Sequence, residues 1–232
     1  MHPARLVAAR MLSPTVRGLT FDPGEGFTFV PGQWTNLFLP QPSGEPLRRA
    51  YSIASPPRAD RHIDLAVTRV EGGPGSTLLH ALEPGATLTI SDAQGVFTLD
   101  PPTRPVLMIG TGTGVAPLRS MLASLRASPP AHRFALLFGV RTAGDVLYGD
   151  DLAALAAEWR GFELHPTLSR PGSDWRGKTG HVQAHVAALM QALGGDCDVY
   201  VCGLNRMVGD VRKMLREELH LDRKRVHTER YD

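Results

Sequence analysis

The sequence predicts two domains: an N-terminal antiparallel β-barrel over residues 1–100 and a C-terminal α/β domain with a parallel sheet over residues 104–232. Three observations lead to this prediction. Short β-prone runs, separated by Pro, Gly and Ser clusters, fill the first half. Strand-like and helix-like runs alternate in the second half. Between the halves, Asp100–Pro105 holds three prolines in six residues, which is typical of an interdomain linker.

The β-prone runs of the first half recur at short spacing between turn residues, as in a small antiparallel barrel or sandwich. They are Phe27–Val30, Trp34–Leu39, Ala50–Ile53, Ile63–Val70, Thr87–Ile90 and Val96–Leu99. One helical pattern, Ser76–Leu82, interrupts them after the Gly-rich stretch Glu71–Gly75. The N-terminus of that helix can face an anion. The alternative is an ordinary loop with an N-cap serine.

The second half alternates between strand and helix and ends on a short strand. The expected strands are Val106–Ile109, Phe134–Val140, Glu163–Leu168, Asp198–Cys202 and Val226–Thr228. The expected helices are Pro117–Arg126, Asp150–Trp159, Val182–Leu193 and Arg206–Glu218. This order predicts a parallel sheet with helices on both faces, which is an architecture that binds nucleotides.

The composition is that of a soluble globular protein, with 21% charged and 42% hydrophobic residues among 232. A net charge of +2 gives no argument for nucleic-acid binding. Two cysteines, Cys197 and Cys202, cannot supply an iron–sulfur cluster or a Cys-rich zinc site, so we expect no metal. The N-terminus lacks a secretory signal, and no apolar run is long enough to span a membrane. We therefore expect a cytoplasmic protein with no membrane partner.

The most informative stretch is Gly110–Pro117, which reads Gly-Thr-Gly-Thr-Gly-Val-Ala-Pro between an expected strand and an expected helix. Glycines there leave backbone N–H groups uncovered at a helix N-terminus, and such groups bind pyrophosphate. The stretch follows the first strand of the predicted parallel sheet, at the edge where such sheets bind their ligands. We therefore expect a dinucleotide at this loop.

A second candidate site lies on the expected strand near residue 50. Alternation along a strand places Arg49 and Tyr51 on one face and Ser52 on the other. Arginine offers a planar fork for phosphate, tyrosine a π-face and serine a small donor, which are the groups that a flavin nucleotide needs. The alternative is an edge strand with a solvated arginine and a half-buried tyrosine.

Two more candidates come late in the chain. Cys202-Gly203, at the end of a strand, lets a flat ring approach the backbone closely, unless Cys202 is simply a buried core thiol. The chain then ends in Glu229-Arg-Tyr231-Asp232, where an ordered aromatic can cover an exposed ring. Most chain ends are simply frayed.

Taken in order, these motifs resemble the ferredoxin–NADP⁺ reductase superfamily. They are Arg-x-Tyr-Ser, Gly-x-Gly-Ser, Gly-Thr-Gly-Thr-Gly-Val-Ala-Pro, Cys-Gly and Glu-x-Tyr, and the resemblance runs from Pro31 to Tyr231. It implies an FAD-binding barrel followed by an NAD(P)-binding α/β domain, with no iron–sulfur domain. It further implies an FAD-dependent oxidoreductase that transfers hydride between NAD(P)H and flavin N5. Electrons would pass to a small acidic one-electron carrier of the ferredoxin or flavodoxin type.

The resemblance also implies roles for individual residues. The expected catalytic residues are Ser52, Cys202 and Glu229. The expected FAD ligands are Arg49, Tyr51, Ser52, Val67, Thr68, Arg69, Pro74, Gly75 and Ser76. The expected ligands of the NAD(P) pyrophosphate and nicotinamide are Thr111, Gly112, Thr113, Gly114, Cys202 and Gly203. Tyr231 matches the aromatic that stacks on the flavin ring in this family, although here Asp232 follows it.

The adenosine end decides between NADPH and NADH. Arg141, Ser169 and Arg170 follow the second and third parallel strands and can clamp a 2′-phosphate. A Ser-Arg pair there is similar to the NADP-specific members, which favours NADPH, and Lys178 is a further candidate. The alternative is that these are surface side chains of an NADH-using protein, with Asp145 at the ribose.

Other functions remain open on the sequence alone. They are the NADH-dependent reductase component of an oxygenase, a reductase of a small acceptor such as free flavin or a ferric chelate, and an electron-transfer subunit of a larger complex. The last class carries a C-terminal cysteine cluster that this chain lacks. A basic patch of Arg48, Arg49, Arg58 and Arg61 can steer an acidic partner or be merely solvated.

Overall fold

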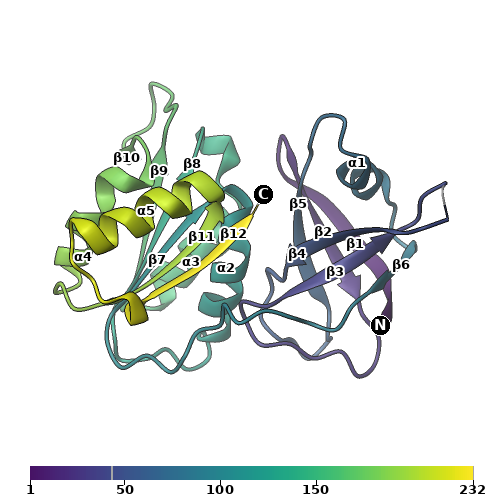
Figure 1. Ribbon diagram of the computed structural model, residues 1–232, viewed down its shortest axis with the longest axis horizontal. Helices are drawn as coiled ribbons and strands as arrows, with labels where there is room; N and C mark the ends of the chain where they lie inside the picture. The colour runs from purple at the N-terminus through teal and green to yellow at the C-terminus, as the bar shows by residue number, and fades with distance from the viewer. Residues whose placement is uncertain (43, 232) are drawn as a thin grey trace.

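A computed structural model describes residues 1–42 and 44–231, and it contains two six-stranded sheets that lie side by side (Figure 1). The first sheet is antiparallel and the second is parallel, which confirms the predicted fold class. The last strand ends at the junction between them (Figure 1). Within the described residues, none of the helices has both the length and the apolar character that crossing a bilayer requires.

The first sheet has the strand order β4-β3-β6-β1-β2-β5. Its strands are β1 (His2–Ser13), β2 (Val16–Asp22), β3 (Trp34–Leu39), β4 (Leu47–Ser52), β5 (Ile63–Thr68) and β6 (Thr87–Ile90), with helix α1 (Pro74–Ala81) between β5 and β6. The edge strands β4 and β5 approach each other through a bridge between Ile53 and Leu65, so the sheet curls into a barrel. Side chains such as Phe21 and Leu37 fill its interior and are fully buried.

Four segments of this barrel differ from the sequence prediction. β1 and β2 are missing from the predicted runs, because β1 reads His-Pro-Ala-Arg-Leu-Val-Ala-Ala-Arg-Met-Leu-Ser and is rich in helix-forming residues. Its pairing with both β2 and β6 overrides that local preference. Phe27–Val30 and Val96–Leu99 were expected as strands and are irregular. In the second of these, Val96 is 97% exposed while Phe97 turns into the interface between the sheets.

The second sheet has the strand order β10-β9-β8-β7-β11-β12. Its strands are β7 (Val106–Thr111), β8 (Phe134–Val140), β9 (Phe162–Leu168), β10 (Lys178–Thr179), β11 (Asp198–Leu204) and β12 (Val226–Tyr231). The helices are α2 (Val115–Ser124), α3 (Gly149–Glu158), α4 (Val186–Ala192) and α5 (Asn205–Glu217). The chain runs outward from β7 to one edge and returns to β11 on the other side. The carboxyl end of β7 is therefore the point where the strand order reverses, where such sheets bind ligands.

Alternate residues of the parallel strands face opposite layers of helices. Met108 of β7 packs with residues of α2 and α3, whereas its neighbours Leu107 and Ile109 pack with α4 and α5. The α2 layer also contacts the barrel, because Phe97 and Ala54 belong to the same buried cluster as α2. This buried cluster thus spans the junction between the two sheets, while the barrel interior forms a cluster of its own.

Candidate functional site

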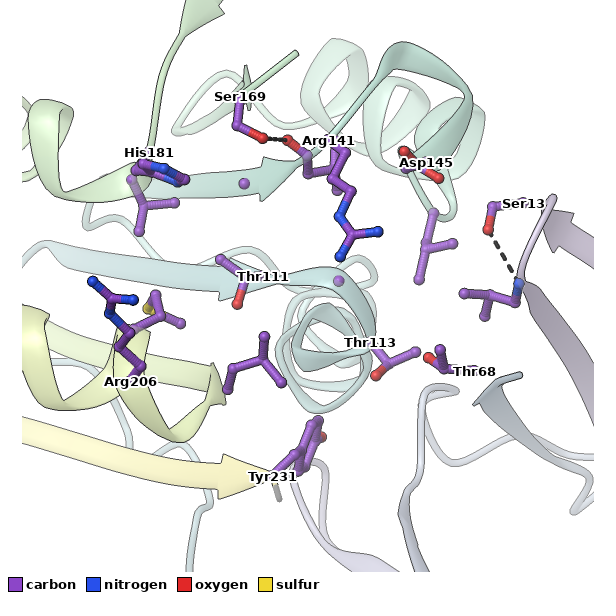
Figure 2. Close-up of a pocket in the computed structure, with 18 of the residues that line it drawn as sticks. Ser13, Thr68, Thr111, Thr113, Arg141, Asp145, Ser169, His181, Arg206 and Tyr231 are labelled. Carbon is purple, nitrogen blue, oxygen red and sulfur yellow. Dashed lines mark hydrogen bonds between the residues drawn. The ribbon is translucent and has the colours of Figure 1, made fainter. Parts of the chain in front are cut away.

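A cavity of about 710 Å³ opens at the junction of the two sheets (Figure 2). The barrel contributes the β1–β2 turn and the end of β5, and the parallel sheet contributes the carboxyl ends of β7, β8, β9 and β11. Among the residues predicted from the sequence, those that line it are Thr68, Thr111, Gly112, Thr113, Arg141, Asp145, Ser169 and Tyr231. The cavity therefore joins parts of both predicted binding sites.

The Gly-rich segment forms the floor of this cavity. β7 ends at Thr111, and residues 112–114 make one turn of 3₁₀-helix that leads into α2 without a side-chain cap. Gly112 has φ +53°, and a Cβ at Gly114 would lie 2.3 Å from the carbonyl oxygen of Cys202, so both positions need glycine. The buried Thr111 Oγ1 has no hydrogen-bond partner in the described part of the chain. An uncapped helix start beside an unpaired hydroxyl suits a phosphate group.

Four polar side chains from three strands meet beside the cavity. Ser52 Oγ at the end of β4 donates to Glu229 Oε1 over 3.0 Å, and it lies 2.6 Å from the Tyr231 hydroxyl. Cys202 Sγ is 3.9 Å from the same carboxyl oxygen. Cys202 pairs with Glu229 in the β11–β12 register, which fixes their side chains next to each other. The structure thus brings together Ser52, Cys202 and Glu229, the three residues for which the sequence suggested catalytic roles.

Burial sets the protonation states of these groups. It raises the pKa of Glu229 to about 7, although hydrogen bonds from Ser52 and Cys202 oppose the shift. It also raises the pKa of the Cys202 thiol well above its usual range, with the nearby Glu229 adding to the effect. Burial also raises the pKa of the Tyr231 hydroxyl strongly. Cys202 is therefore a neutral thiol rather than a nucleophilic thiolate.

The predicted flavin ligands on the barrel cluster around β4 and α1. A Cβ at Gly75 would lie 3.3 Å from Arg49 Cγ, so the arginine stem packs against the first turn of α1, which begins at Pro74. Arg49 is exposed, and Tyr51 beside it is partly buried, which raises its pKa to about 12. Within residues 1–42 and 44–231, Arg49 forms no ion pair with a carboxylate, so its charge is available to a ligand.

Three of the predicted flavin ligands are used differently or lie apart. The hydroxyl of Ser76 accepts from Val70 N and donates to the carbonyl oxygens of Val70 and Gly73, so it fixes the loop before α1. Val67 is fully buried in the barrel core. Arg69 lines a separate hollow of about 290 Å³ that also includes Thr77.

The far end of the cavity carries the cationic side chains. Figure 2 shows the guanidinium of Arg141 directed toward the middle of the cavity, with Ser169 beside it. Arg170 is exposed and does not line the cavity, although its backbone N–H donates to the Arg141 carbonyl. Asp145 is held by hydrogen bonds from the backbone and hydroxyl of Thr142.

Sequence reasoning missed two members of this end, His181 and Arg206. Both line the cavity on the side away from Asp145 (Figure 2). Arg206 was foreseeable, because it lies in the first turn of α5, directly after the Cys202-Gly203 strand end. Neither Arg141 nor Arg206 has an ion-pair partner among the residues that the structure describes.

Comparisons with known proteins agree with the two kinds of binding domain that the sequence suggested. Residues 3–99 match the family model of the oxidoreductase FAD-binding domain, and residues 108–213 match that of the oxidoreductase NAD-binding domain. The chain is 53% identical to ferredoxin–NADP reductase B of Sorangium cellulosum over 99% of its own length and 97% of that relative.

Two other similar proteins are longer than this chain. It is 31% identical to the toluate 1,2-dioxygenase electron transfer component of Pseudomonas putida, over 82% of this chain but only 55% of that protein. The crystal structure of the Amycolatopsis cytochrome P450 reductase GcoB superposes with a TM-score of 0.86 at 28% identity, covering 99% of this chain and 69% of that one.

Proposed function

Because this chain belongs to the ferredoxin–NADP⁺ reductase family, we propose that it carries electrons between NADPH and a small ferredoxin- or flavodoxin-type protein. The protein is an FAD-dependent oxidoreductase that uses a nicotinamide dinucleotide. When bound here, FAD would supply a ring that takes up a hydride from a nicotinamide and releases the electrons singly or in pairs. The single observation that carries the proposal is the meeting of Ser52, Glu229 and Tyr231 beside the interdomain cavity.

The residues at the barrel fit FAD. In this proposal, the unpaired Arg49 and the uncapped start of α1 at Pro74 and Gly75 hold the pyrophosphate. Tyr51 lies along the ring system, and Thr68 and Arg69 complete the site from β5 and the loop after it.

The residues at the cavity floor fit a second dinucleotide. Thr111 and residues 112–114 hold its pyrophosphate, for which the unpaired Thr111 Oγ1 is a ready donor. Cys202 and Gly203 lie behind this turn, where Gly203 leaves room that a Cβ would take up at 2.3 Å from Thr111 Oγ1. Positioning, more than acid–base chemistry, is the contribution of these residues to hydride transfer.

Ser52 and Glu229 hold and move protons at the centre of the site. With a pKa raised to about 7, the Glu229 carboxyl exchanges its proton near neutral pH, and Ser52 Oγ is its hydrogen-bonded neighbour. Tyr231, whose side chain borders the cavity, would cover the flavin ring until a nicotinamide enters.

The preference for NADPH rests on the cations at the far end. Arg141 and Ser169 line the cavity there, as the sequence suggested, and Arg206 and His181 join them. Two arginines without carboxylate partners in the described residues suit a 2′-phosphate, whereas NADH would leave both unpaired. We retain Arg170 as an outer member, because its backbone is bonded to Arg141.

The carrier protein is proposed from the relatives and from surface charge. The Sorangium relative is named a ferredoxin–NADP reductase. Of the four arginines suggested as a docking patch, Arg58 pairs with Asp64 and Arg61 with Glu25. Because Arg49 holds the FAD pyrophosphate in this proposal, Arg48 is the one of the four that keeps a free charge for a carrier in the described structure. We place this exchange in the cytoplasm, in line with the two free, buried cysteines.

One experiment tests the proposal as a whole. The purified protein is loaded with FAD, reduced anaerobically with NADPH or NADH, and then titrated with ferredoxin- and flavodoxin-type carriers. We expect bleaching of the flavin absorbance, faster with NADPH, and stoichiometric reduction of at least one carrier. A protein that takes up no FAD contradicts the proposal.

A second candidate is the reductase component of an oxygenase, which the 31% identity to the toluate dioxygenase component favours. This chain spans only 55% of that protein, so the comparison covers part of its machinery. Faster reduction by NADH than by NADPH in the same experiment would favour this second candidate.

A further inference from the structure

We propose that Arg119 is a positioning residue that fixes the barrel and the dinucleotide-binding helix α2 in the register required for hydride transfer. Arg119 lies one helical turn after Val115, the first residue of α2. It does not line the cavity and touches neither proposed cofactor site. The inference rests on the proposed function, since it concerns the relative placement of the two sites.

The guanidinium of Arg119 is buried between the two sheets, with its side chain only 13% exposed. Its Nε donates to Asp151 Oδ2 of α3 over 2.8 Å, and its NH1 donates to the Ala54 carbonyl of the barrel over 2.7 Å. The group also lies 4.3 Å above the ring of Tyr148. Its donors are thus divided between the barrel and a helix of the α/β domain.

The next residue makes a parallel contact. Ser120 is fully buried, and its hydroxyl donates to the Ser55 carbonyl over 2.6 Å. Two consecutive residues of α2 therefore bind two consecutive carbonyls of the barrel. Both carbonyls belong to the segment that directly follows Ser52, which we place at the centre of the site.

The barrel side of this contact is itself rigid. Asp64 of β5 lies 3.7 Å from Arg119 NH1 and also pairs with Arg58 over 3.2 Å. Asp64 accepts from the Thr20 hydroxyl over 2.8 Å, and its backbone N–H donates to Ser55 Oγ over 3.0 Å. Arg119 and Arg58 thus share the carboxylates Asp64 and Asp151 in one ion-pair network, which specifies one arrangement more than it adds stability.

The consequence concerns distance rather than binding. α2 begins at the turn that holds the nicotinamide nucleotide in our proposal, and Ala54 follows the flavin-contacting end of β4. A shift between them changes the separation of the two rings but leaves the pyrophosphate-binding residues within each domain in place. Misplacement by about 1 Å can slow a reaction on the order of a hundredfold.

The test compares Arg119→Lys and Arg119→Ala with Arg126→Ala. Lysine keeps the charge but lacks the planar fork that reaches Asp151 and Ala54 together. Arg126 is the matched control, because it pairs with Asp151 as Arg119 does. Its side chain is 45% exposed at the surface, where it also pairs with Glu158. For each holoenzyme we measure FAD content, melting temperature, the Kd of NADP⁺, and the flavin reduction rate at saturating NADPH. Reduction by dithionite, which needs no contact with α2, is measured in parallel.

We expect Arg119→Lys to keep its FAD and to bind NADP⁺ within about twofold of the wild type, while reduction by NADPH slows about tenfold or more. Reduction by dithionite stays unchanged, and Arg126→Ala matches the wild type in both reactions. An Arg119→Lys protein with the wild-type NADPH rate overturns the inference. Equal slowing by NADPH and dithionite, or loss of FAD, also overturns it, because the defect would then lie in the flavin site. A wild-type protein that neither nicotinamide reduces would instead contradict the proposed function.

Discussion

Ser52 and Tyr231 lie 179 residues apart in the chain, yet their hydroxyl oxygens are 2.6 Å apart. This contact joins the barrel to the last described residue of the parallel sheet. Glu229 shares it through its own hydrogen bond from Ser52, so a carboxyl group is held between two sheets. Its environment gives the first prediction.

We expect Glu229→Gln to become more stabilising, relative to the wild type, as pH rises. Burial raises the pKa of Glu229 to about 7, above the ordinary value of 4.5. Between these values the folded protein holds a proton that the unfolded chain has released, so the free energy of unfolding falls as pH increases. The effect is absent below pH 4.5 and complete above 7.

Melting temperatures of both proteins between pH 5 and pH 8 measure this effect. Glutamine has no such titration, so the difference in melting temperature should shift in its favour across the interval. A difference that is the same at every pH would mean that Glu229 is already ionised in the folded protein at pH 5.

The two cysteines give a matched pair for the second prediction. Cys202→Ala should slow flavin reduction by NADPH several-fold with FAD retained, because its thiol lies beside Glu229 in the proposed nicotinamide pocket. Cys197 is also a free and fully buried cysteine, but it packs with the α4 and α5 layer. Each change should cost about 1 kcal/mol of stability through the lost volume. If Cys197→Ala slows reduction as much, the effect of Cys202→Ala is one of stability alone.

The parts of the fold that could be predicted are those whose local chemistry has one interpretation. Gly110–Pro117 is such a case, because glycines at a strand end followed by a helix pattern leave few alternatives. β1 could not be predicted, since its Ala, Arg, Leu and Met content favours a helix until β2 and β6 pair with it. Local propensity does not predict such long-range pairing.

The same division holds for the site. Ser52, Cys202 and Glu229 each belong to a motif that is visible in the sequence. Their proximity to one another could be known only from the folded structure. Arg119 belongs to no such motif, because its role depends on a carbonyl 65 residues away. Arg170 stays a prediction, since it lies in the expected segment while its side chain does not border the cavity.

The third prediction concerns the choice between NADPH and NADH. Arg141→Ala and Arg206→Ala should each raise the Michaelis constant for NADPH by about ten- to a hundredfold, as expected for the loss of a charge-assisted bond of roughly 1.5–3 kcal/mol. The constant for NADH should change little, because NADH lacks the 2′-phosphate. Steady-state kinetics with both nucleotides measure the ratio.

Arg170→Ala tests whether the 2′-phosphate binds to the cavity-lining arginines or to the arginine that the sequence pattern suggested. Because Arg170 lies outside the cavity lining, we expect a smaller rise for NADPH than with Arg141→Ala or Arg206→Ala. A larger effect at Arg170 would place the 2′-phosphate outside the described cavity. Equal effects on NADPH and NADH for all three variants would reject the 2′-phosphate assignment altogether.

The fourth prediction tests why the turn before α2 needs a glycine at its end. A Cβ at Gly114 would lie 2.3 Å from the Cys202 carbonyl oxygen and 2.8 Å from Gly203 Cα, both of which are backbone atoms that cannot rotate away. Gly114→Ala should therefore lower stability by about 1–3 kcal/mol, the usual cost of overpacking. It should also slow NADPH-dependent reduction, because β11 must move relative to the turn.

Gly209→Ala in α5 is the control, since a Cβ added there would meet nothing within 4 Å in the described structure outside the backbone of its own helix. Alanine there should add up to about 1 kcal/mol through helix propensity. Thermal unfolding and flavin reduction of both variants measure these effects, and a Gly114→Ala protein as stable and active as the wild type would show that the turn and β11 can separate freely.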